Sequence, residues 1–279
     1  MKTKAVMIAA ALCIILMALG LLVYLRSAHA PRKIVVLPKH AAAKRPPKSA
    51  GLPAVQKKFT NPKVAIVMDD FGYNMKDLDQ IFAARLPVTF SVLPNLKYSR
   101  RVAQLAHSKG FEVILHLPLE ANGSSAAVEA DTIKTSMGAE QITSMLDQEI
   151  SDVPYLKGIS NHQGSKATED GRTMSIIMEG LKKKGLYFFD SFCTSKSVCR
   201  DVARAEGIKY GRRDVFLDDV NTPEAIEKEL LRLRKIAFKK GRAIAVCHDR
   251  KGTIAVLGRM MPLLAEDGVV FVYLSDMVN

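Results

Sequence analysis

The chain has 279 residues, of which 48% are hydrophobic and 25% are charged, so it is long enough to enclose one large core. The formal net charge of +13 is concentrated in residues 1–62, which hold eleven Lys or Arg and no Asp or Glu, leaving 30 of the 41 basic and all 28 acidic residues in 63–279. A protein that acts on nucleic acid carries its basic surface on the fold itself, so this distribution argues against nucleic acid as a partner.

The first segment is strongly apolar. From Ala5 to Leu25 no residue is charged, and these 21 residues are enough to cross a hydrocarbon core of about 30 Å as a helix. We therefore expect residues 1–26 to be a transmembrane anchor or a signal segment that contacts the membrane. Because the apolar region of a signal peptide is usually only about 7–15 residues, a retained anchor is favoured. Cleavage after "AHA", residues 28–30, is the alternative.

Residues 27–62 form a basic linker rich in Pro and Ala, which we expect to be extended or disordered. Lysines and arginines flank the apolar segment on both sides, so the local charge pattern leaves its orientation in the membrane open.

A different pattern begins at Lys63, where short apolar runs alternate with amphipathic stretches. The predicted strands are 64–68, 88–93, 111–117, 157–161, 186–190, 208–211, 243–248 and 269–274. The predicted helices are 75–84, 98–109, 139–151, 170–184, 196–206, 222–240 and 257–266. This alternation indicates a parallel sheet with helical crossovers, either a barrel or an open doubly wound sheet. In both folds the functional groups lie beyond the carboxyl ends of the strands.

Polar residues stand at the predicted strand ends. They are Asp69 and Asp70; His116 and Glu120; Asn161, His162 and Ser165; Asp190 and Ser191; Arg213 and Asp214; and His248. Carboxylate and imidazole without a Cys-x-x-Cys pair suit a divalent metal such as zinc. One Asp and two His would leave a position for water. Of the adjacent aspartates, which the pleat points to opposite faces, one could bind the metal and the other accept a proton from the attacking water.

Two cysteines lie close together in the sequence, Cys193 and Cys199. An exported domain could bridge them, but the sequence does not give the Cα separation that a disulfide requires. Both alternatives, a disulfide and two free thiols, stay open.

Several of these segments resemble one family. The motifs "MDDFG", "LHLPLE", "NHQGS" and a late strand that ends in His are similar to the divergent polysaccharide deacetylase family, a branch of the NodB-type carbohydrate esterases, over residues 62–279. The resemblance implies that residues 63–279 form a deformed (β/α) barrel of about seven parallel strands. It also implies metal-dependent removal of an acetyl group from an amino sugar.

The resemblance suggests individual roles. By the match to the main family, Asp69 is the base, Asp70 and His116 are metal ligands, and His248 is the general acid. Glu120 stands where the main family has a second histidine, and His162 is the candidate for the missing ligand. The remaining strand-end residues are expected to bind the substrate or to support the ligands: Glu120, Asn161, Ser165, Asp190, Ser191, Arg213 and Asp214.

The resemblance therefore predicts a zinc-dependent hydrolase that removes N-acetyl groups from an envelope glycan such as peptidoglycan. We expect it to be anchored in the bacterial inner membrane with the domain in the periplasm, or to be secreted after signal cleavage. The alternative is a non-catalytic envelope protein that binds metal or glycan, because the paired-histidine motif and the Arg-Pro-Tyr groove segment of the main family are missing. A metallophosphatase-type hydrolase would need an Asp-x-His opening and a Gly-Asp second motif, which the sequence lacks at the expected places.

Overall fold

The computed structural model describes residues 52–123 and 129–279. The predicted anchor, residues 1–26, and most of the predicted linker lie outside the described residues. Within the described ranges, no helix is long and apolar enough to cross a bilayer. The end of the predicted linker lies along a helix of the fold, since the backbone N–H groups of Lys58 and Phe59 both donate to the carbonyl oxygen of Phe238 at 3.1 Å.

The described residues form one sheet of nine strands, and all their pairings are parallel. The order is β6-β5-β4-β3-β2-β1-β8-β7, with β9 beside β1. The strands are β1 (Lys63–Phe71), β2 (Val88–Val92), β3 (Val113–Leu119), β4 (Leu156–Gln163), β5 (Tyr187–Asp190), β6 (Tyr210–Arg212), β7 (Val215–Phe216), β8 (Arg242–His248) and β9 (Val270–Phe271).

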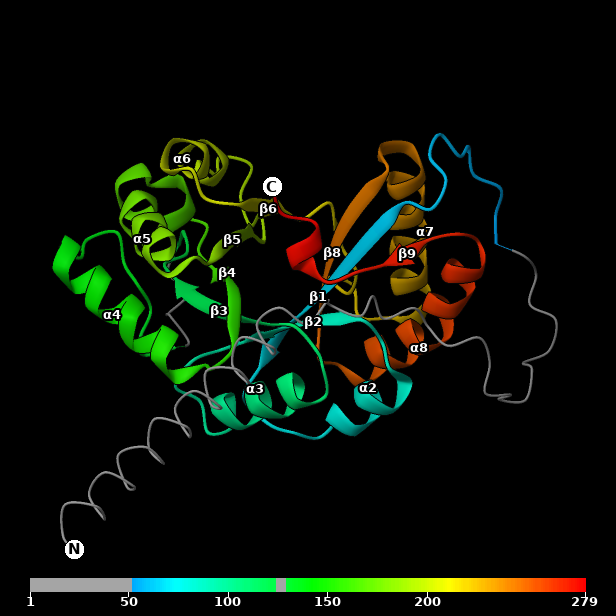
Figure 1. Ribbon diagram of the computed structural model, residues 1–279, viewed down its shortest axis with the longest axis horizontal. Helices are drawn as coiled ribbons and strands as arrows, with labels where there is room; N and C mark the ends of the chain where they lie inside the picture. Colours follow the sequence, from blue (N-terminus) through cyan, green and yellow to red (C-terminus); the bar gives the residue numbers. More distant parts are fainter. Residues whose placement is uncertain (1–51, 124–128) are drawn as a thin grey trace, which may run out of the picture. The chain divides into compact units, whose positions relative to one another are not determined.

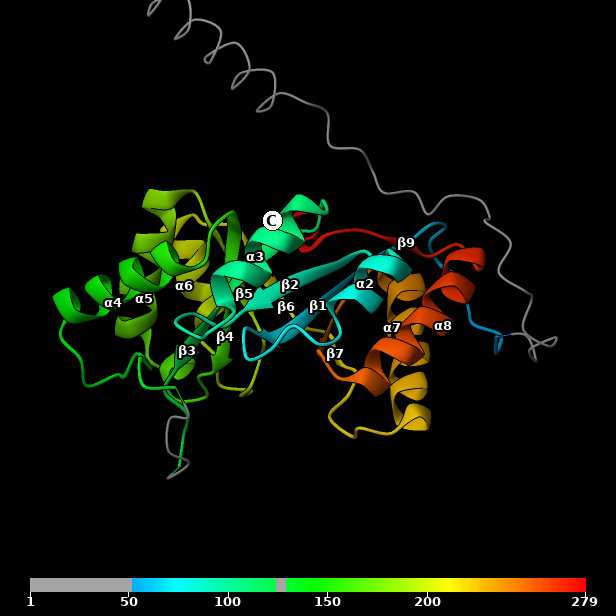
Figure 2. The same cartoon turned by 90° about the horizontal axis from the view of Figure 1, so that it is seen from below.

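Helices connect most of the strands (Figure 1, and from below Figure 2). They are α2 (Leu78–Ala84), α3 (Ser99–Ser108), α4 (Ala139–Asp152), α5 (Gly171–Lys184), α6 (Cys199–Glu206), α7 (Pro223–Lys240) and α8 (Lys251–Glu266), with 3-10 turns η1 (Ala167–Glu169) and η2 (Leu274–Asp276). The predicted helix 257–266 begins six residues earlier, at Lys251, because the helix continues through Gly252 and Gly258.

The start of the longest helix shows how the sequence sets an element boundary. Thr222 precedes α7 in an extended conformation, and its hydroxyl accepts a hydrogen bond from the Ala225 N–H at 3.3 Å. Pro223 follows in the first turn, where backbone N–H groups have no partner within the helix, so the lack of an N–H in proline costs no hydrogen bond. The predicted start at residue 222 therefore falls on the N-cap of the helix.

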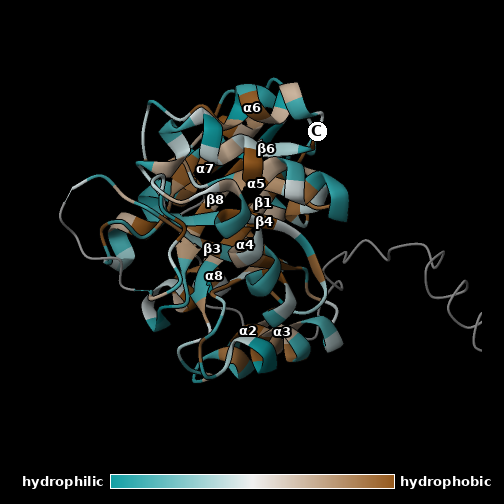
Figure 3. Cartoon of the chain, turned by 90° about the vertical axis from the view of Figure 1, so that its left-hand side faces the viewer, coloured by the Kyte–Doolittle hydropathy of each residue, from teal (hydrophilic) through white to brown (hydrophobic). Residues whose placement is uncertain are grey.

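Alternate side chains of β1 pack in two different clusters. On β1, Val64, Ile66 and Met68 join the cluster that contains the buried faces of the helices. Ala65 and Val67 point the other way and join a second, smaller cluster. Figure 3 shows that hydrophobic residues lie mostly on the central strands, while many polar residues lie on the helices around them.

The second cluster shows that the sheet curls. It combines residues from β1 and β8 with residues of β3 and β5, although β5 lies four strands away from β1 in the sheet. Its strand residues are Ala65, Val67, Ile114, Tyr187, Phe189, Ile244 and Val246. Side chains that far apart in a flat sheet would not touch, so the strands form part of a barrel with this cluster on its inner face.

The C-terminal segment closes the remaining gap. Its Val272 N–H donates to Val64 O on β1 at 2.9 Å, and the Tyr210 N–H of β6 donates to Asn279 O at 2.8 Å. Leu274, Met277 and Val278 complete the inner cluster between these two attachments. The fold is therefore a parallel α/β half-barrel, which agrees with the predicted deformed barrel, and residues 272–279 bridge its open side.

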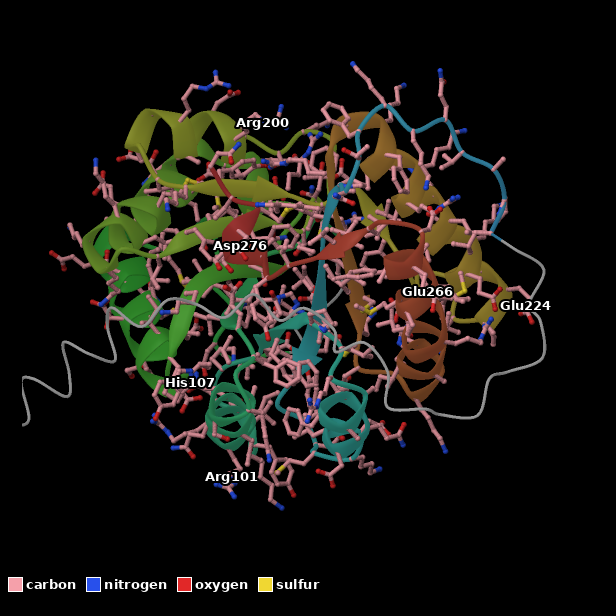
Figure 4. All side chains as sticks on the ribbon, turned by 45° about the vertical axis from the view of Figure 1, so that its right-hand side comes forward. Arg101, His107, Arg200, Glu224, Glu266 and Asp276 are labelled. Carbon is pink, nitrogen blue, oxygen red and sulfur yellow. The ribbon has the colours of Figure 1, made fainter. Side chains whose placement is uncertain are left out.

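Charged side chains cover the outside of the helices (Figure 4). The labelled examples Arg101 on α3, Arg200 on α6 and Glu224 on α7 are all exposed. Against this background, the buried carboxylates and imidazoles at the carboxyl ends of the strands are unusual.

Candidate metal and acid–base site

The two adjacent aspartates have different backbone conformations. Asp69 continues the alternation of Ala65 and Val67, points to the inner face and is only 3% exposed. Regular pleating would send Asp70 to the helix side. Instead, the pairing of β1 with β2 shifts register between Met68 and Phe71, and Asp70 has a φ of 68°. This bulge turns Asp70 inward, where aspartate tolerates the left-handed conformation better than most residues.

Asp70 meets two histidines from neighbouring strands. Its Oδ1 lies 3.5 Å from His116 Nε2 on β3 and 3.3 Å from His162 Nδ1 on β4. The three residues offer ligand atoms that all lie within 4.8 Å of one another. His116 is buried and His162 is partly buried, so the cluster is largely shielded from water.

Two serines, Ser160 and Ser91, hold the imidazole ring of His116 through its Nδ1 nitrogen. His116 Nδ1 lies 2.8 Å from Ser160 Oγ, and Ser160 Oγ lies 2.8 Å from Ser91 Oγ on β2. If His116 Nδ1–H donates to Ser160, the Nε2 lone pair faces Asp70. Metal-binding histidines are usually oriented through their second nitrogen in this manner.

The residues fit a divalent cation. Asp69 Oδ1 and Asp70 Oδ1 are buried and make no hydrogen bond to the described residues. Leaving a buried carboxylate oxygen without a donor or a cation is costly. One carboxylate and two imidazoles are a normal ligand set for catalytic zinc, which keeps a further position open.

Electrostatics distinguish the two carboxylates. Burial would raise the pKa of Asp70, but the neighbouring imidazoles of His116 and His162 lower it well below its ordinary value. Burial raises the pKa of Asp69, against the opposing charge of His116. Asp70 therefore stays ionised, as a ligand must, while Asp69 has the greater affinity for a proton.

His248, at the end of β8, faces Asp70 from the other side. Its Nε2 lies 3.6 Å from Asp70 Oδ2, and its Nδ1 lies 3.0 Å from Asp218 Oδ1. Asp218 is fully buried and also accepts from the His248 N–H at 3.0 Å and from Thr253 Oγ1 at 2.8 Å. Burial would lower the pKa of His248, but the bond to Asp218 and the charge of Asp70 raise it above its ordinary value.

Sequence reasoning missed Asp218. It follows β7, a two-residue strand whose pattern is too short to predict. The one available signal was the acidic pair Asp218-Asp219 directly after the apolar residues 215–217.

Four of the predicted supporting residues shape the loop beside the cluster. Asn161 Oδ1 accepts from the Ser191 N–H at 2.8 Å, and Asp190 Oδ1 accepts from the Phe192 N–H at 2.7 Å. Arg213 donates from Nε to Ser191 O at 2.6 Å and from Nη2 to Phe192 O at 3.0 Å. These bonds tie the carboxyl ends of β4, β5 and β6 together.

The other three predicted residues make contacts with loops and strands. Glu120 accepts from the Thr135 N–H and from Lys166 Nζ, both at 2.8 Å. Ser165 Oγ accepts from the Asn122 N–H at 2.8 Å. Asp214 accepts from the Ile244 N–H at 3.0 Å and pairs with Lys240 at 3.1 Å. A role for these three in substrate binding stays a prediction.

The two cysteines, Cys193 and Cys199, differ in their exposure to solvent. Cys193 and Cys199 are both free thiols in this structure. Cys199 is buried on α6, whereas Cys193 is exposed and its Sγ lies 3.5 Å from Asn161 Nδ2.

The fold and the side-chain cluster define a class of protein: a parallel α/β half-barrel with carboxylates and imidazoles gathered at the carboxyl ends of its strands. The sequence profile of the divergent polysaccharide deacetylase family matches residues 66–278, and the chain belongs to this family.

Three relatives illustrate the similarity. The chain is 34% identical over 230 residues to the Escherichia coli K12 protein YibQ, covering 82% of this chain and 72% of YibQ. It is 34% identical over 209 residues to a Haemophilus influenzae protein, covering 75% and 74% of the two chains. The crystal structure of ATU2773 from Agrobacterium tumefaciens C58 shares the fold, with a TM-score of 0.75, 24% identity, and coverage of 82% of this chain and 93% of that one.

Proposed function

We propose that the protein is a metal-dependent hydrolase that removes N-acetyl groups from an amino-sugar glycan of the cell envelope. The observation that carries the proposal is the arrangement around Asp70. Two histidines contact one of its oxygens, and the carboxylate-paired His248 contacts the other. The family to which the chain belongs supports a carbohydrate substrate.

Asp70 Oδ1, His116 Nε2 and His162 Nδ1 are the atoms that would hold the metal, for which we propose zinc. A zinc ion bound there would polarise the acetyl carbonyl and lower the pKa of water. Side chains of the protein are proposed to carry out the proton transfers.

Asp69 is proposed as the general base. Its Oδ1 lies 3.7 Å from His116 Nδ1, beside the ligand set but not part of it. It accepts the proton of the attacking water as the water oxygen adds to the acetyl carbon. Its burial keeps the carboxylate away from bulk solvent, so its affinity for that proton is higher than in water.

His248 is proposed as the general acid. The bond between its Nδ1 and Asp218 holds the ring and directs Nε2 toward Asp70. As the amide C–N bond breaks, Nε2 donates a proton to the leaving amine nitrogen, and the products are acetate and a free amino sugar.

The cellular location is also a proposal. We propose that residues 1–26 anchor the protein in the bacterial inner membrane and that the domain faces the periplasm, where envelope glycans lie. The uncharged run from Ala5 to Leu25 supports an anchor.

A second candidate function is non-catalytic glycan or metal binding. Glu120 favours it, because it replaces the second histidine of the main family and contacts Thr135 and Lys166. Such a protein would keep the metal ligands without turnover.

Acetate release distinguishes the two candidates. The zinc-loaded chain is incubated with peptidoglycan fragments and N-acetylated chito-oligomers, and acetate is quantified. We expect release that falls about 10²–10⁴-fold in Asp69→Asn. If a chain that binds zinc releases no acetate from any of these glycans, the non-catalytic function is correct. If Asp69→Asn is fully active, Asp69 is not the base.

A further inference from the structure

A third carboxylate reaches the outer side of His162. Glu129 Oε2 lies 3.2 Å from His162 Nε2, on the side of the ring opposite to Asp70. The other oxygen, Oε1, accepts a hydrogen bond from the Tyr73 hydroxyl at 2.7 Å. The Glu129 side chain is only 8% exposed and that of His162 16%, so the contact between them is largely shielded from water, whereas Tyr73 is 49% exposed.

The position of Glu129 is set by the fold. Thr132 Oγ1 donates to Glu129 O at 2.8 Å, and Ile133 continues the edge of β3 through an isolated parallel bridge to Leu119. Ile133 N–H donates to Pro118 O at 3.0 Å. A segment anchored to the strand that carries His116 therefore delivers Glu129 to the histidine on the next strand, β4.

The contact keeps a proton on the Nε2 nitrogen of His162. A carboxylate only accepts, so the 3.2 Å contact with Glu129 requires a proton on Nε2, and Nδ1, which faces Asp70, is the nitrogen that would bind a metal. Gln163 Nε2 also approaches His162 Nε2 at 3.5 Å. If the Gln163 amide is rotated by 180°, its oxygen accepts from the same proton.

We propose that Glu129, held by Tyr73, is a positioning residue that orients His162 and strengthens its binding of a divalent metal. Tyr73 and Glu129 come from segments 56 residues apart, so the hydrogen bond between them also joins the loop after β1 to the segment after β3. The inference rests on the metal site of the proposed function and adds a residue to it.

Metal affinity tests the proposal without any substrate. Zinc binding to the metal-stripped 279-residue chain is measured by competition with a chromophoric chelator. We expect Glu129→Ala to weaken zinc binding about 10–100-fold, the usual effect of removing such an outer partner. Glu129→Gln keeps an acceptor but loses the charge, so its loss is expected to be smaller. Tyr73→Phe should weaken binding less than Glu129→Ala.

Two residues outside the site provide matched controls. Glu229→Gln removes a carboxylate that pairs with Arg232 within α7, and Tyr155→Phe removes the hydroxyl of an exposed tyrosine. Both should bind zinc as the wild type does. Zinc binding in Glu129→Ala and Glu129→Gln within twofold of wild type would overturn the inference and leave the metal site intact. A wild-type chain that binds no zinc would overturn the metal site itself.

The Nε2 proton of His162 gives a second readout. Nitrogen-15 NMR of the histidine side chains in the zinc-loaded protein should show His162 bound through Nδ1 and protonated at Nε2 in the wild type. In Glu129→Ala this Nε2 proton should exchange faster with water, while the melting temperature of the metal-free protein stays close to that of wild type. An Nε2 proton that exchanges no faster in Glu129→Ala would contradict the proposed contact between His162 and Glu129.

Discussion

Asp70 contacts three histidines from three different strands, and this depends on its backbone conformation. Its φ of 68° and the register shift beside it rotate its carboxylate to the same side as that of Asp69. Both aspartates then contact the His116 ring, at 3.7 Å and 3.5 Å. Alternation along a regular strand would separate them, so the bulge is what brings the carboxylates of two adjacent residues to the same histidine ring.

The contact between His248 and Asp218 leads to a prediction about catalysis. In Asp218→Asn the side chain still fills its place but no longer offers the negative charge that holds the proton on Nδ1. If His248 is the general acid, we expect kcat to fall about 10²-fold or more, with zinc affinity unchanged. Acetate-release kinetics and chelator competition measure the two effects. Full activity in Asp218→Asn together with an inactive His248→Ala would show that the pair is not needed to orient the acid.

A buried carboxylate away from the site gives a prediction about stability. Glu149 on α4 is 1% exposed, and neither of its oxygens makes a hydrogen bond to the described residues. Burial, with a smaller effect of Asp131, raises the pKa of Glu149 from 4.5 to about 9. Because the folded pKa exceeds the unfolded one, the neutral side chain favours folding fully below pH 4.5, and this contribution is lost as the pH rises toward 9.

Glu149→Gln removes this titration. Between about pH 5 and about pH 8 the wild type should lose more than about 1 kcal/mol of unfolding free energy relative to the variant, since each pKa unit corresponds to about 1.4 kcal/mol. Urea unfolding of both proteins at the two pH values measures the difference. Curves that shift equally with pH in both proteins would show that Glu149 does not titrate with folding.

At the scale of elements, the loop after β4 must bring His162 into place. Gly164 has a φ of 84°, and a Cβ there would lie 2.8 Å from Leu119 Cβ. Strand β4 pairs with β3 up to Gln163, so the chain turns sharply just beyond the histidine.

We therefore expect Gly164→Ala to destabilise the fold by about 1–3 kcal/mol and to weaken zinc binding, because backbone strain moves the turn that holds His162. Gly171→Ala is the matched control, since it lies at the start of α5 with nothing within 4 Å of an added Cβ. It should leave both quantities close to wild type. Urea unfolding and chelator competition measure them, and equal behaviour of the two variants would contradict the role given to the turn.

Whether a site residue could be predicted from sequence depends on whether it lies at the end of a strand or in a loop. Asp69, Asp70, His116, His162 and His248 were predicted together because parallel strands end at one edge of a sheet. Asp218 and Glu129 were not, because they lie in loops without a periodic pattern. The bridge between Leu119 and Ile133 holds the segment that carries Glu129 beside His162, and no local sequence pattern predicts this tertiary pairing.

At the scale of the whole domain, the half-barrel depends on its last residues. Met277 is 1% exposed and packs in the inner cluster with Val67 and Ile244. The alternation of strands and helices predicted a parallel α/β fold, but it gave no sign that residues 272–279 would bridge β1 and β6. That bridge follows from the curvature of the sheet, which no single element encodes.

Met277→Ala should lower the free energy of unfolding by about 2–5 kcal/mol, because it leaves a cavity in the inner cluster. Val220→Ala, at a side chain that is 60% exposed, should change it by no more than about 0.5 kcal/mol. Urea unfolding compares the two. A cost for Met277→Ala as small as that for Val220→Ala would contradict the closing role of the C-terminal segment.

The chemistry of this domain depends on the side chains at the ends of its strands. The proposed function requires Asp70, His116 and His162 to bind one divalent metal. Calorimetric titration of the metal-stripped 279-residue chain with zinc measures this binding. We expect one zinc per chain for the wild type, and loss of binding in Asp70→Ala and in His162→Ala. Absence of binding in the wild type, or undiminished binding in both variants, would rule out the proposed metal site.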